Sequence, residues 1–242
     1  MSILLLAGIP FEGSFWKEVQ ARLTHHERSS MTSTLCKDAG SLGEQIQILK
    51  GIIETNDIDT IVAHGLSLPL AIEVSHLSTN RRLILSNGLL TPDVGLIRWI
   101  LPRLQQIPCT LKRQLLRPSF SLPAMASSTA FRRLVINPYV MSRSTLDDLT
   151  KELLADVNYR KHVSKYLTSL ETWTLRSPNN TNVYGIWGDH DLLFPVEQIE
   201  GVRSQLPTLA QKTVTISGGA HFHPIERPWS IADAIHTILS EE

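Results

Sequence analysis

Three residues of this chain have the types and the order needed for nucleophilic catalysis: Ser67, Asp191 and His221. A serine hydroxyl attacks a carbonyl carbon when a base takes its proton, and the base works best when a carboxylate orients it. Ser67 supplies the hydroxyl and His221 the base. The carboxylate is Asp191 or its neighbour Asp189, which follow the same apolar run. This set predicts acyl transfer through a covalent acyl-enzyme.

Ser67 lies in a segment whose pattern predicts a strand, a tight turn and a helix. The apolar run Thr60–Ala63 reads as a buried strand, Gly65-Leu66-Ser67-Leu68 as the turn, and Leu70–Val74 as the helix, with Pro69 in its first turn. Such a turn presents a side chain at its tip and directs the first N–H groups of the helix at the same point. We therefore expect Ser67 Oγ to stand clear of the sheet.

The other elements must bring these residues together. Apolar runs alternate with helical periodicity, which predicts an α/β fold with a mostly parallel sheet flanked by helices. Ligands of such sheets lie beyond the carboxyl ends of the strands, where all three residues fall. Predicted strands cover 3–7, 31–35, 60–63, 83–85, 183–187 and 213–216, and predicted helices cover 15–23 (with Ser14 as N-cap), 41–53, 70–74, 196–206 and 228–239.

The middle of the chain has a different pattern. Prolines interrupt the segment 91–176, no strand is evident in it, and 144–154 and 159–173 read as helices. We expect 1–90 and 177–242 to form the α/β core and 91–176 to be a helical cap inserted into it. A second, independent helical domain is the alternative for this segment.

Composition limits the classes of function. The chain has 242 residues, 42% hydrophobic and 19% charged, with a formal net charge of +0. It can bury a sizeable core, and nothing in its charge favours a nucleic-acid partner. Its two cysteines, Cys36 and Cys109, are too few for a disulfide scaffold and fit reduced thiols in the cytoplasm. The apolar run at the N-terminus is too short to span a membrane and reads as a strand.

A metal or cofactor site is not expected. His190, His221 and His223 lie on two loops without regular ligand spacing. His64 and His223 are expected to shape the pocket. Asp93, which follows the predicted strand 83–85, is a rival for the carboxylate role.

Four stretches carry a wider pattern: Leu4-Leu5-Leu6-Ala7-Gly8-Ile9-Pro10, then Gly65-Leu66-Ser67-Leu68, then Ile186-Trp187-Gly188-Asp189-His190-Asp191 with Pro195, and finally Gly219-Ala220-His221-Phe222 before Glu226-Arg227-Pro228. Together they resemble an α/β-hydrolase-fold serine hydrolase of the small capped type found among esterases, lactonases and C–C bond hydrolases. The order serine, acid, histidine is also that of this family. The resemblance covers nearly the whole chain.

The resemblance implies roles for further residues. It implies an oxyanion hole made by the backbone N–H groups of Leu68 and Ile9, and it favours Asp191 as the residue that orients His221. The expected substrate is a small molecule with a hydrophobic acyl group, held as an ester or as a thioester on a carrier protein or coenzyme A. Its expected contacts are Phe11, Leu66, Phe222 and Trp99.

Two other functions stay open. The same triad could serve a C–C bond hydrolase or a cyclase acting on a β-diketone or polyketide-like compound. Alternatively, the chain is a binding protein on a hydrolase scaffold that has lost its activity. Ala7, where the family has His, and Pro69, where the elbow has its closing Gly, favour this last reading. The sequence does not indicate the oligomeric state.

Overall fold

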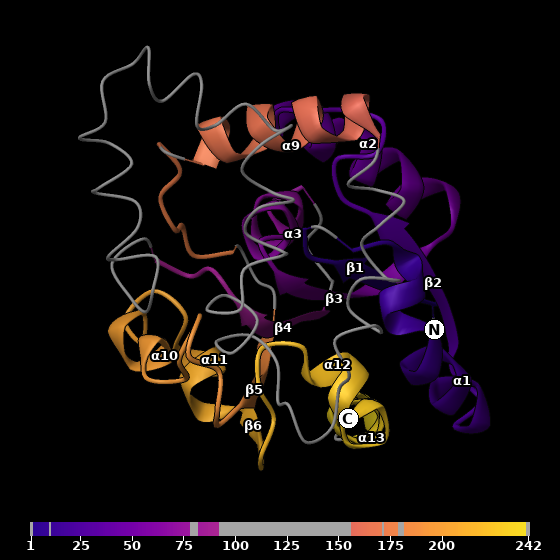
Figure 1. The fold of residues 1–242 in the computed structure, drawn as a ribbon. Helices are drawn as coiled ribbons and strands as arrows, with labels where there is room; N and C mark the ends of the chain where they lie inside the picture. Colours follow the sequence, from indigo (N-terminus) through magenta and orange to yellow (C-terminus); the bar gives the residue numbers. More distant parts are fainter. Residues whose placement is uncertain are drawn as a thin grey trace.

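The computed structural model describes residues 2–9, 11–77, 82–91, 156–170, 172–178 and 182–240. Their strands form one six-stranded sheet with the order β2-β1-β3-β4-β5-β6, and every neighbouring pair is parallel (Figure 1). The α/β prediction is confirmed. The strands are β1 (Ser2–Ala7), β2 (Ser29–Thr34), β3 (Ile58–Gly65), β4 (Arg82–Gly88), β5 (Asn182–Gly188) and β6 (Thr213–Ile216).

Helices cover both faces of the sheet (Figure 1). Alternate residues of a strand point to opposite faces, so Leu4 and Leu6 pack in one core cluster and Ile3 and Leu5 in the other. The first cluster includes residues of α2 (Leu42–Thr55), α3 (Leu68–Ser75) and α9 (Val157–Leu170), and the second includes residues of α1 (Lys17–His25) and α13 (Pro228–Ser240). Burial on both faces explains why the central strands are continuous apolar runs.

The helix α2 begins where the sequence predicted. Ser41 Oγ accepts a hydrogen bond from the Glu44 N–H at 3.2 Å, and the Glu44 carboxylate accepts one from the Ser41 N–H at 2.9 Å. This reciprocal pair is a capping box, and it satisfies two backbone donors that the first helical turn would leave unpaired. The first predicted helix is less regular, because the chain forms a 3₁₀ turn, Gly13–Trp16, before α1, and Ser14 caps nothing.

The prediction of one helix over 196–206 is wrong. Within that range only α10 (Gln198–Gly201) is helical; turns follow it, and a separate helix, α11 (Pro207–Gln211), begins just beyond the range. The apolar side chains behind the prediction, Ile199, Val202 and Leu206, are nevertheless buried. Their spacing therefore correctly indicated which residues face the core. It did not indicate that the helix ends at Gly201 and that a new one begins at Pro207. A further short helix, α12 (His223–Glu226), follows the histidine loop.

Part of the predicted cap can be placed. The helix α9 lies beside α2, and its Tyr166 hydroxyl donates a hydrogen bond to the Leu66 carbonyl at 2.9 Å (Figure 1). Beyond it, the Trp173 indole N–H donates to Glu73 Oε1 at 2.9 Å. The segment from α9 to Trp173 thus packs on the α3 side of the sheet. The predicted helix 144–154 lies outside the described residues, and the division into core and cap stays a prediction.

Within the described ranges, none of the helices combines the length and the apolar character needed to cross a bilayer.

Candidate active site

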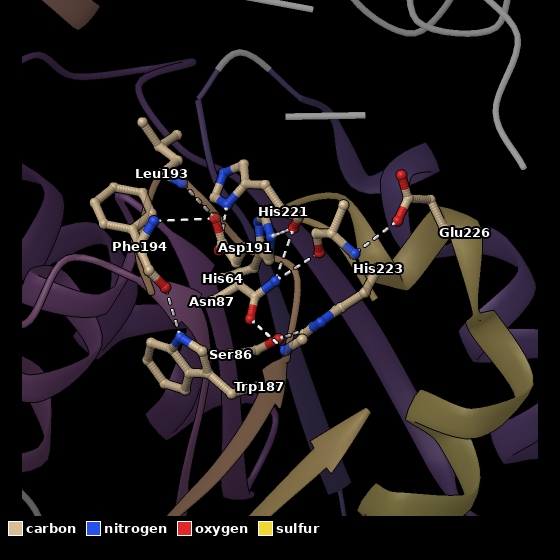
Figure 2. Close-up of polar contacts among 12 residues, drawn as sticks. His64, Ser86, Asn87, Trp187, Asp191, Leu193, Phe194, His221, His223 and Glu226 are labelled. Atoms are coloured by element: carbon tan, nitrogen blue, oxygen red, sulfur yellow. Dashed lines mark hydrogen bonds and ion pairs between the residues drawn. The ribbon is translucent and has the colours of Figure 1, made fainter. Parts of the chain in front are cut away.

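His221 and Asp191 form a buried pair at the carboxyl end of the sheet. His221 Nδ1 donates to Asp191 Oδ2 at 3.0 Å, and the two residues are only 5% and 3% exposed. The backbone N–H groups of Leu193 and Phe194 donate to Asp191 Oδ1 at 2.8 and 3.0 Å (Figure 2). These bonds hold the carboxylate, which in turn fixes the proton of His221 on Nδ1. The Nε2 lone pair is left free to act as a base.

The loop that carries Asp191 has its own anchor. The Trp187 indole N–H, at the end of β5, donates to the Phe194 carbonyl at 2.8 Å (Figure 2). The loop therefore closes on itself around the carboxylate. The rival Asp189 is placed differently, because its Oδ1 accepts from the Gly218 N–H at 2.8 Å and pairs with the exposed His190. The other rival, Asp93, lies outside the described residues.

Gly65 is the residue that faces His221 Nε2. It is the last residue of β3, and its φ of +65° places it in the left-handed region. A Cβ built on Gly65 would lie 3.8 Å from His221 Nε2 and 3.9 Å from its Cε1. One further bond would carry a hydroxyl within hydrogen-bonding reach of that nitrogen. A sharp strand-to-helix turn opposite the base is where a hydrolase holds its nucleophile, and here that position has no side chain.

Ser67 lies in a different place from the one predicted. Its side chain is 0% exposed, and its Oγ donates to the His64 carbonyl at 2.8 Å and accepts from the His64 N–H at 3.0 Å. The Leu6 carbonyl lies 3.3 Å from the same oxygen. The hydroxyl is thus turned back into the strand that precedes it. This geometry contradicts the prediction that Ser67 Oγ stands clear of the sheet as the nucleophile.

The residue at the tip of the turn, Gly65, lies two positions before the predicted Ser67. The family pattern has its nucleophile between two small residues, each two positions away. Ala63 and Ser67 flank Gly65 at that spacing, so Ser67 takes the place of the closing small residue in that pattern. The flanking Ala63 is the signal in the sequence that could have located the turn at Gly65. The apparent departure at Pro69 also disappears, because Pro69 lies beyond the pattern.

The expected position of the oxyanion donors changes when the tip of the turn is Gly65. The donor after the nucleophile position is the Leu66 N–H, in place of the predicted Leu68 N–H, which begins α3. Within the described part of the chain, the N–H groups of Leu66 and Ile9 have no backbone acceptor. Gly8 lets the Ile9 loop pass the elbow closely, since a Cβ there would lie 2.8 Å from the His64 carbonyl oxygen.

Two buried neutral histidines support the site. His64 Nε2 donates to the His221 carbonyl at 2.9 Å, and His223 Nε2 lies 2.7 Å from Ser86 Oγ (Figure 2). Burial, reinforced by the neighbouring His221, lowers the pKa of His64 well below 6.5 and that of His223 to about 3. Both imidazoles are therefore uncharged at neutral pH. Among the described residues no cluster of side chains could hold a metal ion.

The predicted substrate contacts have different surroundings. Phe11 and Phe222 are almost fully buried and pack edge to face, with ring centroids 4.7 Å apart. The Phe222 ring also lies 4.9 Å from the His221 ring. These two residues thus belong to the core beneath the histidine. Leu66 is half-buried on the elbow, and Trp99 lies outside the described residues.

No protein-family model and no curated protein matches the sequence. Solved structures do match its fold. The chain aligns over 99% of its length with 89% of an esterase from Thermogutta terrifontis, at 17% identity and a TM-score of 0.74. It aligns over 100% of its length with 92% of a serine hydrolase involved in carbazole degradation, at 16% identity and a TM-score of 0.71. It also aligns over 100% of its length with 91% of an epoxide hydrolase from Vigna radiata, at 16% identity and a TM-score of 0.63. The chain has the α/β-hydrolase fold.

Proposed function

We propose that this protein is a hydrolase in which His221, oriented by Asp191, activates water directly, without an acyl-enzyme. One observation carries the proposal: the His221–Asp191 pair is intact at 3.0 Å, while the residue opposite the free Nε2 is Gly65. A base without a side-chain nucleophile can still act on a water molecule that occupies the place of the hydroxyl. The likeness in fold to esterases and other hydrolases supports a hydrolytic reaction.

The reaction would proceed in one addition and one elimination. His221 Nε2 takes a proton from water while the water oxygen bonds to the carbonyl carbon, and the carbonyl π electrons move onto the carbonyl oxygen. The N–H groups of Leu66 and Ile9 would hold that oxyanion. A donor of this kind typically lowers the barrier by roughly 3–4 kcal/mol. The intermediate then breaks its bond to the leaving group, which receives the proton from the His221 imidazolium.

An ester or thioester with an apolar acyl group remains the substrate class that we propose. Thioesters and activated esters suit a direct attack by water, because their leaving groups depart easily. The same base could also take a proton from the substrate itself, which would serve the cyclase or C–C bond reaction considered from the sequence. In both cases His221 reacts and Ser67 does not.

A binding protein is the second candidate. The absence of a side chain at Gly65 favours it, because a ligand hydroxyl or amide N–H could sit against His221 Nε2 and remain uncleaved. His221 Nε2 would then accept a hydrogen bond from the ligand. The two functions differ in one measurable respect, since only the hydrolase needs His221 for turnover.

The test compares three proteins on p-nitrophenyl esters and acyl thioesters of increasing chain length: wild type, His221→Ala and Ser67→Ala. Hydrolysis should be abolished in His221→Ala and kept in Ser67→Ala, without a burst of product in the first turnover. Turnover that is lost in Ser67→Ala, in a protein that is still folded, would restore the serine mechanism. No turnover by wild type, together with ligand binding detected by calorimetry, would favour the binding protein.

A further inference from the structure

Asn87 joins the two loops that carry the His221–Asp191 pair. It lies near the end of β4, between β3 and β5 in the sheet, and its side chain is 0% exposed. Its Nδ2 donates to the Ala220 carbonyl at 2.8 Å and to the His221 carbonyl at 3.3 Å. Its Oδ1 accepts from the Gly188 N–H at 2.8 Å (Figure 2).

These three bonds need a carboxamide. An amide group carries donors on one atom and an acceptor on the other, whereas a carboxylate of the same shape carries acceptors alone. One side of Asn87 therefore binds the start of the Asp191 loop, and the other binds the backbone of His221. The side chain is a rigid spacer between the acid and the base.

The backbone of Asn87 supports a specific role for this side chain. Its φ is +37°, in the left-handed region that glycine adopts most easily. A glycine at position 87 would adopt this conformation without strain. Asparagine tolerates the region better than most residues and adds the hydrogen bonds. The amide is thus kept at a position where the backbone itself would favour glycine.

Other bonds hold the same loops without Asn87. The His190 N–H donates to the Gly219 carbonyl at 3.0 Å, and the Ala220 N–H donates to Glu226 Oε2 at 3.0 Å. His64 Nε2 adds a second hydrogen bond to the His221 carbonyl. The loops should therefore stay folded when the amide is removed. What the amide adds is the fixed position of His221 relative to Asp191.

We infer that Asn87 is a positioning residue, whose amide holds the His221 imidazole in register with Asp191 by fixing the Gly188 N–H and the His221 carbonyl on one rigid group. It contacts no reacting atom and acts through the backbone of His221. Only the expected change in kcat rests on the proposed function. Its structural consequence can be measured on the protein without any substrate.

The test uses Asn87→Gly, which keeps the backbone conformation, and Asn87→Asp, which keeps the shape and removes the donors. Asn56→Asp is the matched control, because Asn56 Nδ2 also donates to a backbone carbonyl, Ile52, but at the end of α2 and in an exposed place. The readouts are the downfield proton resonance of His221 Nδ1–H, thermal unfolding, and kcat and KM on the best ester or thioester.

In both Asn87 variants we expect the His221 Nδ1–H resonance to move upfield or vanish, while unfolding stays cooperative. The value of kcat should fall by roughly 10–100-fold with KM little changed, because small misplacements of a catalytic group cost that much. Asn56→Asp should match wild type. An unchanged resonance in Asn87→Gly, or loss of folding in both variants, would overturn the inference. A moved resonance in a protein without turnover would uphold it and count against the hydrolase alone.

Discussion

Gly65 and His221 face each other across the carboxyl end of the sheet, with the site of a Gly65 Cβ 3.8 Å from His221 Nε2. The elbow keeps the left-handed backbone that a nucleophile would need, φ +65°, and the base keeps its carboxylate partner. The nearest atom to that Cβ, the Gly8 Cα, is 3.6 Å away, which is ordinary van der Waals contact. A serine would therefore fit where the chain has none.

Gly65→Ser should create a reactive serine. Its Oγ would extend toward His221 Nε2, so a fluorophosphonate should add covalently to the variant and leave wild type unmodified, as measured by intact mass. Because a side chain in the left-handed region is strained, the free energy of unfolding should fall by about 1–2 kcal/mol. The control is Gly43→Ser, since Gly43 lies on α2 with open space around it. Labelling of wild type at Ser67 would contradict this account of the elbow.

Ser67→Ala should lower stability and leave the chemistry of the site intact. Removing the Oγ leaves its partners on the His64 backbone in a buried place, which typically costs about 1–3 kcal/mol in the free energy of unfolding. Urea denaturation measures that loss. Ser75→Ala is a matched control, because Ser75 is another buried serine whose Oγ donates to a backbone carbonyl, that of Ile72. A fully inactive Ser67→Ala protein with the wild-type fold is the result that would disprove the assignment.

Asp191→Asn should depress the rate of hydrolysis by roughly 10²–10⁴-fold, because the amide cannot hold the proton of His221 on Nδ1 and orient the ring as the carboxylate does. The measurement is kcat/KM on the best substrate of the ester and thioester series, beside circular dichroism to confirm folding. Asp189→Asn is the control, since Asp189 is two residues away and bonds to Gly218 and His190. Equal losses in both variants would show that the loop, and not the pairing with His221, matters.

Mild acid should destabilise the protein through its buried histidines. The pKa of His223 falls from 6.5 to about 3 in the folded chain, and that of His64 also falls well below 6.5, both mainly through burial. At a pH below 6.5 and above the lowered pKa values, the unfolded chain binds more protons than the folded chain. The free energy of unfolding therefore drops as the pH falls in this range. Each of the two imidazoles contributes about 1.4 kcal/mol per pH unit below 6.5.

Urea denaturation from about pH 7.5 to about pH 5 measures this loss. His223→Gln, which keeps a hydrogen-bonding group near Ser86 and cannot gain a proton, should show a shallower dependence than wild type. His25→Gln, on an exposed part of α1, should leave the dependence unchanged. An identical slope in wild type and His223→Gln would mean that His223 is not held neutral.

The sequence by itself predicted a mostly parallel sheet with flanking helices, and it placed His221 and the two candidate carboxylates, Asp189 and Asp191, at the carboxyl ends of the strands. Central parallel strands are buried on both faces, so they must be apolar runs, and such runs can be read without a structure. The loops after β5 and β6 are short, so residues at those strand ends necessarily meet at one edge. The helix over 41–53 was predicted in the same way, from the spacing of its apolar residues, and it forms as α2.

Only the tertiary structure decided which residue of the elbow faces the base. Gly65 and Ser67 are two positions apart, and the sign of one backbone angle determines which of them stands at the tip of the turn. The strand–turn–helix pattern, together with the reactivity of a hydroxyl, suggested the serine. The fold buried that hydroxyl against the His64 backbone and turned Gly65 toward His221, a choice set by packing between strands far apart in the chain. The role of Asn87 also required the tertiary structure, because its three hydrogen bonds join residues more than 100 positions apart in the sequence.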